Sequence, residues 1–115
     1  MNTIETPELQ LKLLISHPNF KLVNALEPTK FRLKHIPGSI NIFNSKDISK
    51  KLDKENEIVI YCSDYCCKKS ISLYYQLVDL GYQNVRRYAA GLTEWEKYGL
   101  PLRASALGSH VLLTR

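Results

Sequence analysis

The segment Ile58-Val59-Ile60-Tyr61 is the feature that most restricts how this chain can fold. Its three consecutive β-branched residues favour a strand, and an uninterrupted apolar run is typical of a strand that is buried on both faces. Such strands occur in parallel sheets that helices cover on each side. Other short apolar runs alternate along the chain with segments of helical pattern. The sequence therefore predicts an α/β protein with a central, mainly parallel sheet flanked by helices on both faces.

The expected helices and strands follow one another in a regular order. A first helix starts at Thr6-Pro7-Glu8, with Thr6 as N-cap and Pro7 as the first helical residue, and it ends at His17-Pro18. The longest later helix is expected over residues 70–80, with Gly81 at its carboxyl end. The apolar faces assigned to these two helices are Leu9, Leu11, Leu13, Leu14 and Ile15, and Ile71, Tyr74, Tyr75, Leu77, Val78 and Leu80. Strands are expected at residues 20–24, 39–42, 57–61 and 84–88, and shorter helices after Pro28 and at residues 46–52 and 93–98.

Composition and charge exclude several classes of function. The 115 residues, 44% of them hydrophobic, suit one domain with a substantial core. The net charge is +5, but the basic residues are scattered, which does not favour nucleic-acid binding. No apolar run approaches the roughly 18 residues that span a membrane, and the start of the chain lacks the features of a secretory signal, so a cytoplasmic location is expected. We expect one domain over residues 1–103 and a tail over residues 104–115, whose pattern does not decide between strand and helix.

All three cysteines fall within six positions directly after the buried strand, at Cys62, Cys66 and Cys67. An odd number at such close spacing is not a disulfide framework. Open α/β sheets bind ligands at the carboxyl ends of their strands, where a loop before a helix directs backbone N–H groups toward an anion. A thiol in that position has a lowered pKa and is nucleophilic at neutral pH. Lys68 and Lys69 add positive charge to the same loop.

The cysteines also have simpler interpretations. Cys62 at a strand end suits a small apolar core residue, and the two loop cysteines can be incidental. Cys67 has two further alternatives, because it can itself be the nucleophile or can resolve a sulfenate or persulfide on Cys62 as a disulfide. The sequence leaves open whether the resting protein contains a disulfide. A zinc site with His17 or His35 is disfavoured, since the adjacent cysteines 66 and 67 do not suit one tetrahedral ion, and His35 is expected to order the turn before Ile-Pro-Gly.

Several segments, in the right order and spacing, resemble those of single-domain rhodanese-like proteins over roughly residues 4–102. The segment HIPGSINI at 35–42 is similar to the family's HIPGAINIP, and IVIYC at 58–62 resembles the strand that ends in the active-site cysteine. LGYQNV at 80–85 and AGLTEW at 90–95 are similar to LGYxNV and GGxxxW, and GLP follows at 99–101. The second cysteine makes the chain similar to a rhodanese subgroup with an enlarged Cys-x4-Cys loop.

The resemblance implies that the protein transfers sulfur. In this family a small anionic donor such as thiosulfate, or a persulfide-carrying protein, passes a sulfane sulfur to the loop cysteine, and a thiol acceptor removes it. By position Cys62 matches the nucleophile, Lys69 stands where the family usually has arginine, and Cys67 is the alternative or resolving cysteine. The resemblance implies no metal and no organic cofactor, and no nucleic acid or membrane as a partner. Substrate contacts are expected from Ser63, Asp64, Tyr65, Cys66, Lys68 and Ser70, the last of which matches the serine that opens the helix.

The chain also departs from the family pattern. Six residues separate Cys62 from Lys69, whereas the common loop has four and phosphatase members have five with an arginine, so phosphatase or arsenate reductase activity fits poorly. Lysine cannot grip an oxyanion bidentately as arginine does. Asn24 and Leu26 replace the usual aspartate and arginine after the first strand, and Ala90-Gly91 replaces a pair of glycines. These departures support an alternative function, a non-catalytic or regulatory module that binds a protein partner.

Overall fold

A parallel sheet forms the centre of the molecule. The structure, a computed structural model, describes residues 1–104 and 112–113. Its main sheet has the order β2-β1-β3-β4 and contains β1 (Phe20–Asn24), β2 (Ile40–Asn41), β3 (Glu57–Tyr61) and β4 (Val85–Arg87). All its pairings are parallel, and β3 lies between β1 and β4, where an uninterrupted apolar run is expected. The predicted α/β class with a mainly parallel sheet is confirmed.

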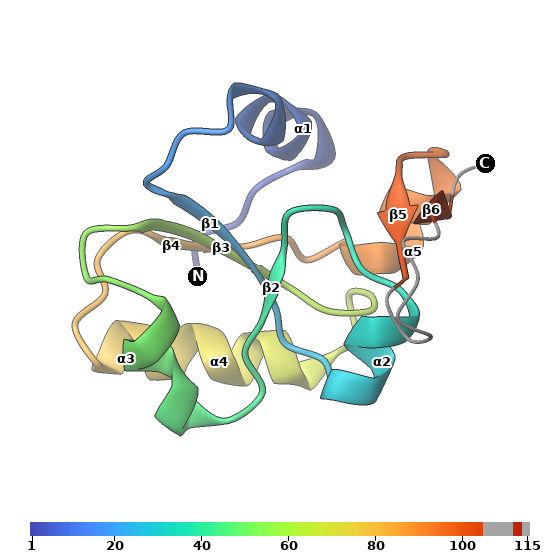
Figure 1. The fold of residues 1–115 in the computed structure, drawn as a ribbon. Helices are drawn as coiled ribbons and strands as arrows, with labels where there is room; N and C mark the ends of the chain where they lie inside the picture. Colours follow the sequence, from blue (N-terminus) through green and yellow to red (C-terminus); the bar gives the residue numbers. More distant parts are fainter. Residues whose placement is uncertain (105–111, 114–115) are drawn as a thin grey trace.

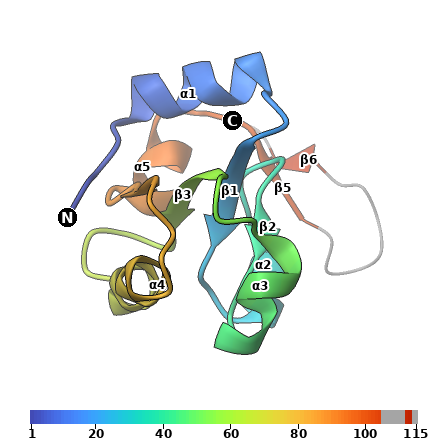
Figure 2. The same cartoon turned by 90° about the vertical axis from the view of Figure 1, so that its left-hand side faces the viewer.

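Helices cover both faces of this sheet (Figures 1 and 2). Helix α1 (Thr6–Ile15) lies above the sheet in Figure 1, and α4 (Lys68–Asp79) lies below it. Below the sheet are also α2 (Pro28–Leu33) and α3 (Ile48–Lys51), which follows the short 3-10 helix η1 (Ser45–Asp47). Helix α5 (Gly91–Lys97) contacts α1 through a hydrogen bond of 2.8 Å, which Thr6 Oγ1 donates to Glu94 Oε2.

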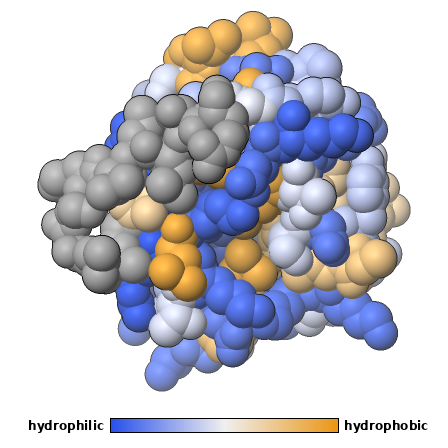
Figure 3. Space-filling view, turned by 90° about the vertical axis from the view of Figure 1, so that its right-hand side faces the viewer, coloured by the Kyte–Doolittle hydropathy of each residue, from blue (hydrophilic) through white to orange (hydrophobic). Residues whose placement is uncertain are grey.

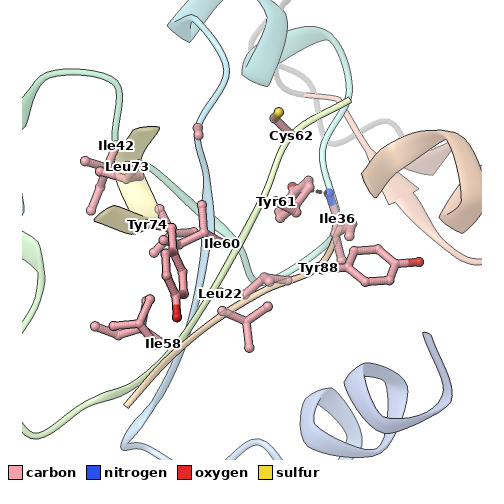
Figure 4. Close-up of a cluster of buried hydrophobic side chains, with 14 of the residues drawn as sticks. Leu22, Ile36, Ile42, Ile58, Ile60, Tyr61, Cys62, Leu73, Tyr74 and Tyr88 are labelled. Carbon is pink, nitrogen blue, oxygen red and sulfur yellow. Dashed lines mark hydrogen bonds between the residues drawn. The ribbon is translucent and has the colours of Figure 1, made fainter. Parts of the chain in front are cut away.

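The core lies on both sides of β3. Residues 58–61 of this strand are completely buried. Leu22 in β1 and Leu77 in α4 are no more than 2% exposed. Figure 4 shows Ile60 and Tyr74 on the side of the sheet toward α4, and Leu22 and Tyr88 on the other side. Tyr61 accepts a hydrogen bond of 2.9 Å from the Ile36 amide, so that its hydroxyl group is satisfied inside the core. The strand that the apolar run predicted is therefore the best-buried element of the fold.

Helix α1 buries a narrower face than its sequence suggested. Leu9 is fully buried and Leu13 packs against the core, but Leu11, Leu14 and Ile15 are 56%, 81% and 62% exposed. The predicted face was wrong for these three residues. A surface helix contacts the sheet along one side only, and five closely spaced apolar residues cover more of the helix surface than that side. Figure 3 shows the hydrophobic side chains at the top of the molecule, where α1 lies. The predicted N-cap was also wrong by one residue, since Glu5 is the N-cap and the Thr6 hydroxyl bonds to Glu94.

Helix α4 likewise differs from the prediction. It begins at Lys68, two residues before the predicted start, and its N-cap is Cys67, which makes no side-chain capping bond and so gave no sequence signal. Tyr74 and Leu77 are buried as predicted, together with Ser70 and Leu73, which the predicted face omitted. The predicted inward positions that the structure exposes are Tyr75, Val78 and Leu80.

The carboxyl-terminal part returns to the turn around His35. Strand β5 (Leu102–Arg103) pairs antiparallel with β6 (Leu112–Leu113), and the remaining tail residues, 105–111 and 114–115, lie outside the described residues. The backbones of His35 and Arg103 exchange two hydrogen bonds of 2.9 Å. His35 Nδ1 lies 2.7 Å from the Phe31 carbonyl oxygen in α2, so the imidazole bonds the helix before the turn, and its ordering of the turn itself stays a prediction. No helix within the described ranges is long and apolar enough to cross a membrane.

Candidate active-site loop

Cys62 is the first residue after β3, at the carboxyl edge of the sheet, and residues 62–67 form the cysteine loop that leads into α4. The sulfur atoms of Cys62 and Cys67 are joined in a disulfide, with their Cα atoms 6.3 Å apart. Cys62 is only 1% exposed and belongs to the core cluster, whereas Cys66 is an exposed free thiol. The disulfide that the sequence left open is present in this structure, and it joins the nucleophile candidate to the resolving candidate.

Asp64 organises the tip of the cysteine loop. Its side-chain Oδ1 accepts a hydrogen bond of 3.0 Å from the Cys66 amide, and its carbonyl accepts one of 3.2 Å from the Cys67 amide. A turn in which the side-chain oxygen of aspartate accepts a hydrogen bond from the amide two residues later is an Asx turn, and aspartate favours this local structure. In this disulfide form the two amides therefore contact Asp64 and do not surround a sulfur, contrary to the expected cup of loop N–H groups.

The start of α5 holds the first two residues of the loop. The Leu92 amide donates to the Cys62 carbonyl at 3.0 Å, and the Thr93 amide and hydroxyl donate to the Ser63 carbonyl at 2.9 and 3.0 Å. Gly91 lies so close that an added Cβ would be 2.7 Å from the Cys62 carbonyl oxygen, and its φ of +66° also favours glycine. The close approach of α5 therefore requires a residue without a side chain at position 91.

Arg87, at the end of β4, holds the second half of the loop. Its Nε donates to Ser70 Oγ at 2.8 Å and its Nη2 donates to the Tyr65 carbonyl at 3.2 Å. Ser70 Oγ in turn donates to the Cys67 carbonyl at 3.4 Å. Arg87 is 6% exposed, and no carboxylate among the described residues forms an ion pair with it. The positive charge that contacts this loop thus comes from the sheet.

Sequence reasoning missed Arg87. The available signal was the pair Arg86-Arg87 inside the strand expected at residues 84–88. In the parallel register Arg87 is opposite Ile60, a completely buried residue, so its side chain lies on the face of the sheet that packs on α4. An arginine at a buried strand position needs polar partners, and these partners are Tyr65 in the cysteine loop and Ser70 in the first turn of α4.

The two lysines at the start of α4 lie at the surface. Lys68 and Lys69 are both exposed, and Lys69 Nζ lies 3.8 Å from Glu27 Oε1 and 5.5 Å from the centre of the Phe43 ring. An exposed ion pair of this kind is worth roughly 0–1 kcal/mol. The structure therefore places Lys69 beside Glu27, before α2, and the catalytic role assigned to it from the sequence stays a prediction.

The remaining predicted positions lie around the loop. Tyr65 is 62% exposed, and the negative charge of Glu94 raises the pKa of its hydroxyl group. Asn24 ends β1 beside Tyr61, and its Oδ1 accepts a hydrogen bond of 2.8 Å from the Leu26 amide. The Asn24 Nδ2 is buried and has no hydrogen-bond partner within the described part of the chain. The roles of Ser63, Asp64, Tyr65 and Cys66 in binding a substrate stay predictions.

The molecule also contains a groove that is separate from the cysteine loop. It has a volume of about 650 Å³ and runs between α1, the turn after His35 and the residues that follow α5. None of its described lining residues belongs to residues 62–70. Over the described ranges, no three His, Cys, Asp or Glu side chains are grouped so as to hold a metal ion.

The geometry defines a class of protein, an α/β domain with a cysteine loop at the carboxyl end of a central parallel strand. A family model described as a rhodanese-like domain matches residues 8–98, so the chain belongs to the rhodanese-like family. A solved protein from Bacillus halodurans has a TM-score of 0.83 and 20% identity, with 91% of this chain and 78% of that chain covered. A rhodanese-related protein from Thermoplasma volcanium has a TM-score of 0.70 and 20% identity, with 89% and 97% covered. An uncharacterised protein from the yeast Saccharomyces cerevisiae has a TM-score of 0.74 and 22% identity, with 86% of this chain and 93% of that chain covered.

Proposed function

We propose that this protein is a sulfurtransferase that carries a sulfane sulfur as a persulfide on Cys62. In the loading step the Cys62 thiolate attacks the sulfane sulfur of thiosulfate, and sulfite leaves with the electrons of the broken S–S bond. A persulfide-carrying protein is the alternative donor, with its own thiolate as leaving group. The observation that carries the proposal is the position of Cys62, the first residue after the central strand, in a loop that α5 and Arg87 both hold.

The electrostatics of the loop support an anionic donor and an anionic persulfide. Arg87 brings a buried positive charge to the backbone of the loop, and α4 starts directly after Cys67. A cation and a helix N-terminus both favour the thiolate over the thiol and attract anions. Arg87 thereby supplies the charge that the family's loop arginine supplies elsewhere, although it does so from β4.

The proposed chemistry belongs to a reducing compartment. Loading requires the Cys62–Cys67 disulfide to be open, because only a free thiolate attacks the donor. Disulfides in the cytosol are usually transient and catalytic, which agrees with a bond between two loop cysteines five residues apart. We propose a cytoplasmic location, a thiol acceptor, and membership of the rhodanese subgroup with an enlarged Cys-x4-Cys loop.

The first prediction tests the nucleophile. Reduced protein is incubated with thiosulfate and its intact mass is measured before and after cyanide treatment. We expect an adduct of one sulfur that cyanide removes, that is absent in Cys62→Ser, and that persists in the control Cys66→Ser, whose thiol is exposed and free. An adduct that survives in Cys62→Ser and is absent in Cys67→Ser would assign the nucleophile to the second cysteine.

A second candidate function is a regulatory module that binds a protein partner without catalysis. Two observations favour it, the 1% exposure of Cys62 and the ion pair of Lys69 with Glu27, a residue outside the cysteine loop. The same mass experiment distinguishes the two functions. If neither thiosulfate nor a persulfide-carrying protein adds sulfur to any cysteine of the reduced chain, the binding module is the better description.

A further inference from the structure

The Cys62–Cys67 disulfide indicates where the transferred sulfur goes. We propose that Cys67 is the acceptor for the persulfide on Cys62, so that the protein releases hydrosulfide and closes its own disulfide. This inference rests on the proposed function, because it requires a persulfide on Cys62. It adds an activity to that function, the reduction of a sulfane sulfur to hydrosulfide within one chain.

The first support is the reach of Cys67. Its sulfur is bonded to the Cys62 sulfur, with the two Cα atoms 6.3 Å apart, inside the range of about 4.4–6.8 Å that a disulfide needs. The inner sulfur of a Cys62 persulfide is this same Cys62 sulfur. The Cys67 sulfur bonds the Cys62 sulfur in the oxidised protein. The Cys67 thiolate can therefore reach and attack the same Cys62 sulfur when that atom carries a sulfane sulfur.

The second support is access from outside. Cys62 is 1% exposed and belongs to the core cluster, whereas Cys67 is partly exposed and Cys66 is exposed. An external thiol must penetrate the loop to reach the Cys62 sulfur, but Cys67 is already beside it. A reaction between two groups held in one molecule has an advantage equivalent to a very high local concentration. Cys67 therefore competes effectively with acceptors in solution.

The third support is the way the backbone of Cys67 is fixed. Its amide donates to the Asp64 carbonyl at 3.2 Å, and its carbonyl accepts from Ser70 Oγ at 3.4 Å. Ser70 is held by Arg87 at 2.8 Å. These contacts hold Cys67 on both sides at the first turn of α4, next to Cys62. The Cys66 amide bonds the Asp64 side chain, and its sulfur is a free thiol among the described residues, so it does not compete for the same bond.

The reaction balances without a further oxidant. The Cys67 thiol loses its proton to solvent, and the thiolate attacks the Cys62 sulfur of the persulfide. The bond between the Cys62 sulfur and the sulfane sulfur breaks, and the sulfane sulfur leaves with that electron pair and takes a proton to become hydrosulfide. Cys67 is oxidised, the sulfane sulfur is reduced, and the product is the disulfide present in this structure.

Turnover then requires a dithiol reductant. Its first thiolate attacks the Cys67 sulfur, because Cys67 is the more exposed residue of the two, and Cys62 leaves as a thiolate. Its second thiol resolves the mixed disulfide, so the reductant becomes a disulfide and both cysteines are free again. The reaction that regenerates the two free cysteines after each turnover is therefore a thiol–disulfide exchange with this reductant.

The test is a single turnover. Fully reduced protein, freed of reductant, is mixed with a slight deficit of thiosulfate, and released hydrosulfide, free thiols and intact mass are followed over time. We expect the wild type to release about one hydrosulfide per loaded chain and to lose two thiols as the Cys62–Cys67 disulfide forms. Cys67→Ser is expected to keep the sulfur adduct and to release hydrosulfide roughly a hundredfold more slowly until an external thiol is added. Ser72→Ala, at an exposed position of α4 outside the cysteine loop, is the control and is expected to behave as the wild type.

The outcomes separate this inference from the proposed function. If the wild type loads sulfur but keeps the adduct as stably as Cys67→Ser does, the acceptor is external, and only this inference fails. Peptide mapping that finds the sulfane sulfur on Cys67 would also overturn it, because the attack would then have been on the outer sulfur. If no chain gains sulfur, the proposed function fails as well. Circular dichroism of each variant checks that its fold is retained.

Discussion

At the scale of single residues, Arg87 changes the interpretation of the site most. A buried charge is costly unless it is hydrogen-bonded, and Arg87 bonds Ser70 Oγ and the Tyr65 carbonyl without an ion pair among the described residues. Its charge is therefore not neutralised locally. A positive charge that remains in a low-dielectric environment favours a nearby anion, and the anion proposed for this loop is a cysteine thiolate or persulfide.

Arg87→Met should make the Cys62 thiol less acidic. Methionine keeps much of the buried volume but removes the charge, so we expect the midpoint of Cys62 ionisation to rise by roughly one pH unit. The measurement is thiolate ultraviolet absorbance against pH, in a Cys66→Ser/Cys67→Ser background where Cys62 is the only cysteine. Arg87→Lys keeps the charge and should preserve most of the midpoint. An unchanged midpoint in folded Arg87→Met would show that Arg87 holds the loop by hydrogen bonds alone.

At the scale of elements, the contact between α5 and the cysteine loop fixes the start of the loop. Gly91 allows the approach, and the amides of Leu92 and Thr93 bond the carbonyls of Cys62 and Ser63. Backbone carbonyls at the end of a central strand would otherwise lack partners in a buried region. The loop therefore depends on a helix about thirty residues further along the chain, as the separation between Thr93 and Ser63 shows.

Gly91→Ala should destabilise the protein and disturb the loop. The added methyl group would lie 2.7 Å from the Cys62 carbonyl oxygen, and φ is +66°, so we expect a loss of about 2–4 kcal/mol in the free energy of unfolding. Gly38→Ala is the matched control, since φ is +86° there but nothing lies within 4 Å of the added group. It should cost only about 1–2 kcal/mol. Equal losses in denaturant titrations of the two variants would show that backbone strain accounts for both.

The sequence predicted elements where one physical signal dominates. The apolar run 58–60 could only be buried on both faces, so the strand, its central position and the cysteine loop after it were all predictable. The buried face of α4 was not predictable, because the helix carries apolar residues such as Tyr75 and Val78 on more than one side. Packing on the sheet alone decides which of these residues are buried. The role of Arg87 depends on the strand register, which pairs it with Ile60, and no local pattern encodes that pairing.

At the scale of the whole molecule, two buried tyrosines, Tyr61 at the end of β3 and Tyr88 directly after β4, make the fold sensitive to alkali. Burial raises the pKa of Tyr61, and burial raises the pKa of Tyr88 to about 12. The Thr6 hydroxyl donates to Glu94, so the Tyr88 hydroxyl donates to Thr6 at 2.7 Å. The neutral phenol is the form that fits the core. Its stabilising effect is complete below the ordinary pKa near 10 and is lost as the pH rises through the folded value.

The free energy of unfolding should therefore fall as the pH rises from 10 toward 12, with a contribution from Tyr88 of about 2–3 kcal/mol. Tyr88→Phe should lose about 1 kcal/mol at pH 7, because the bond to Thr6 is missing, and should have a shallower decline in alkali. Denaturant titrations at several pH values measure both effects. They are best made in Cys66→Ser, so that the free thiol does not attack the disulfide at high pH. Parallel curves for the two proteins would rule out Tyr88 as the source of the decline.

The free Cys66 beside a closed disulfide has a practical consequence. In the oxidised protein it is the exposed free thiol among the three cysteines, so a maleimide fluorophore would attach there selectively before any reduction. Reduction afterwards would leave the label in place while Cys62 and Cys67 separate. The emission of a dye at the tip of the loop would then report each opening and closing of the disulfide in real time, and so each turn of the proposed cycle.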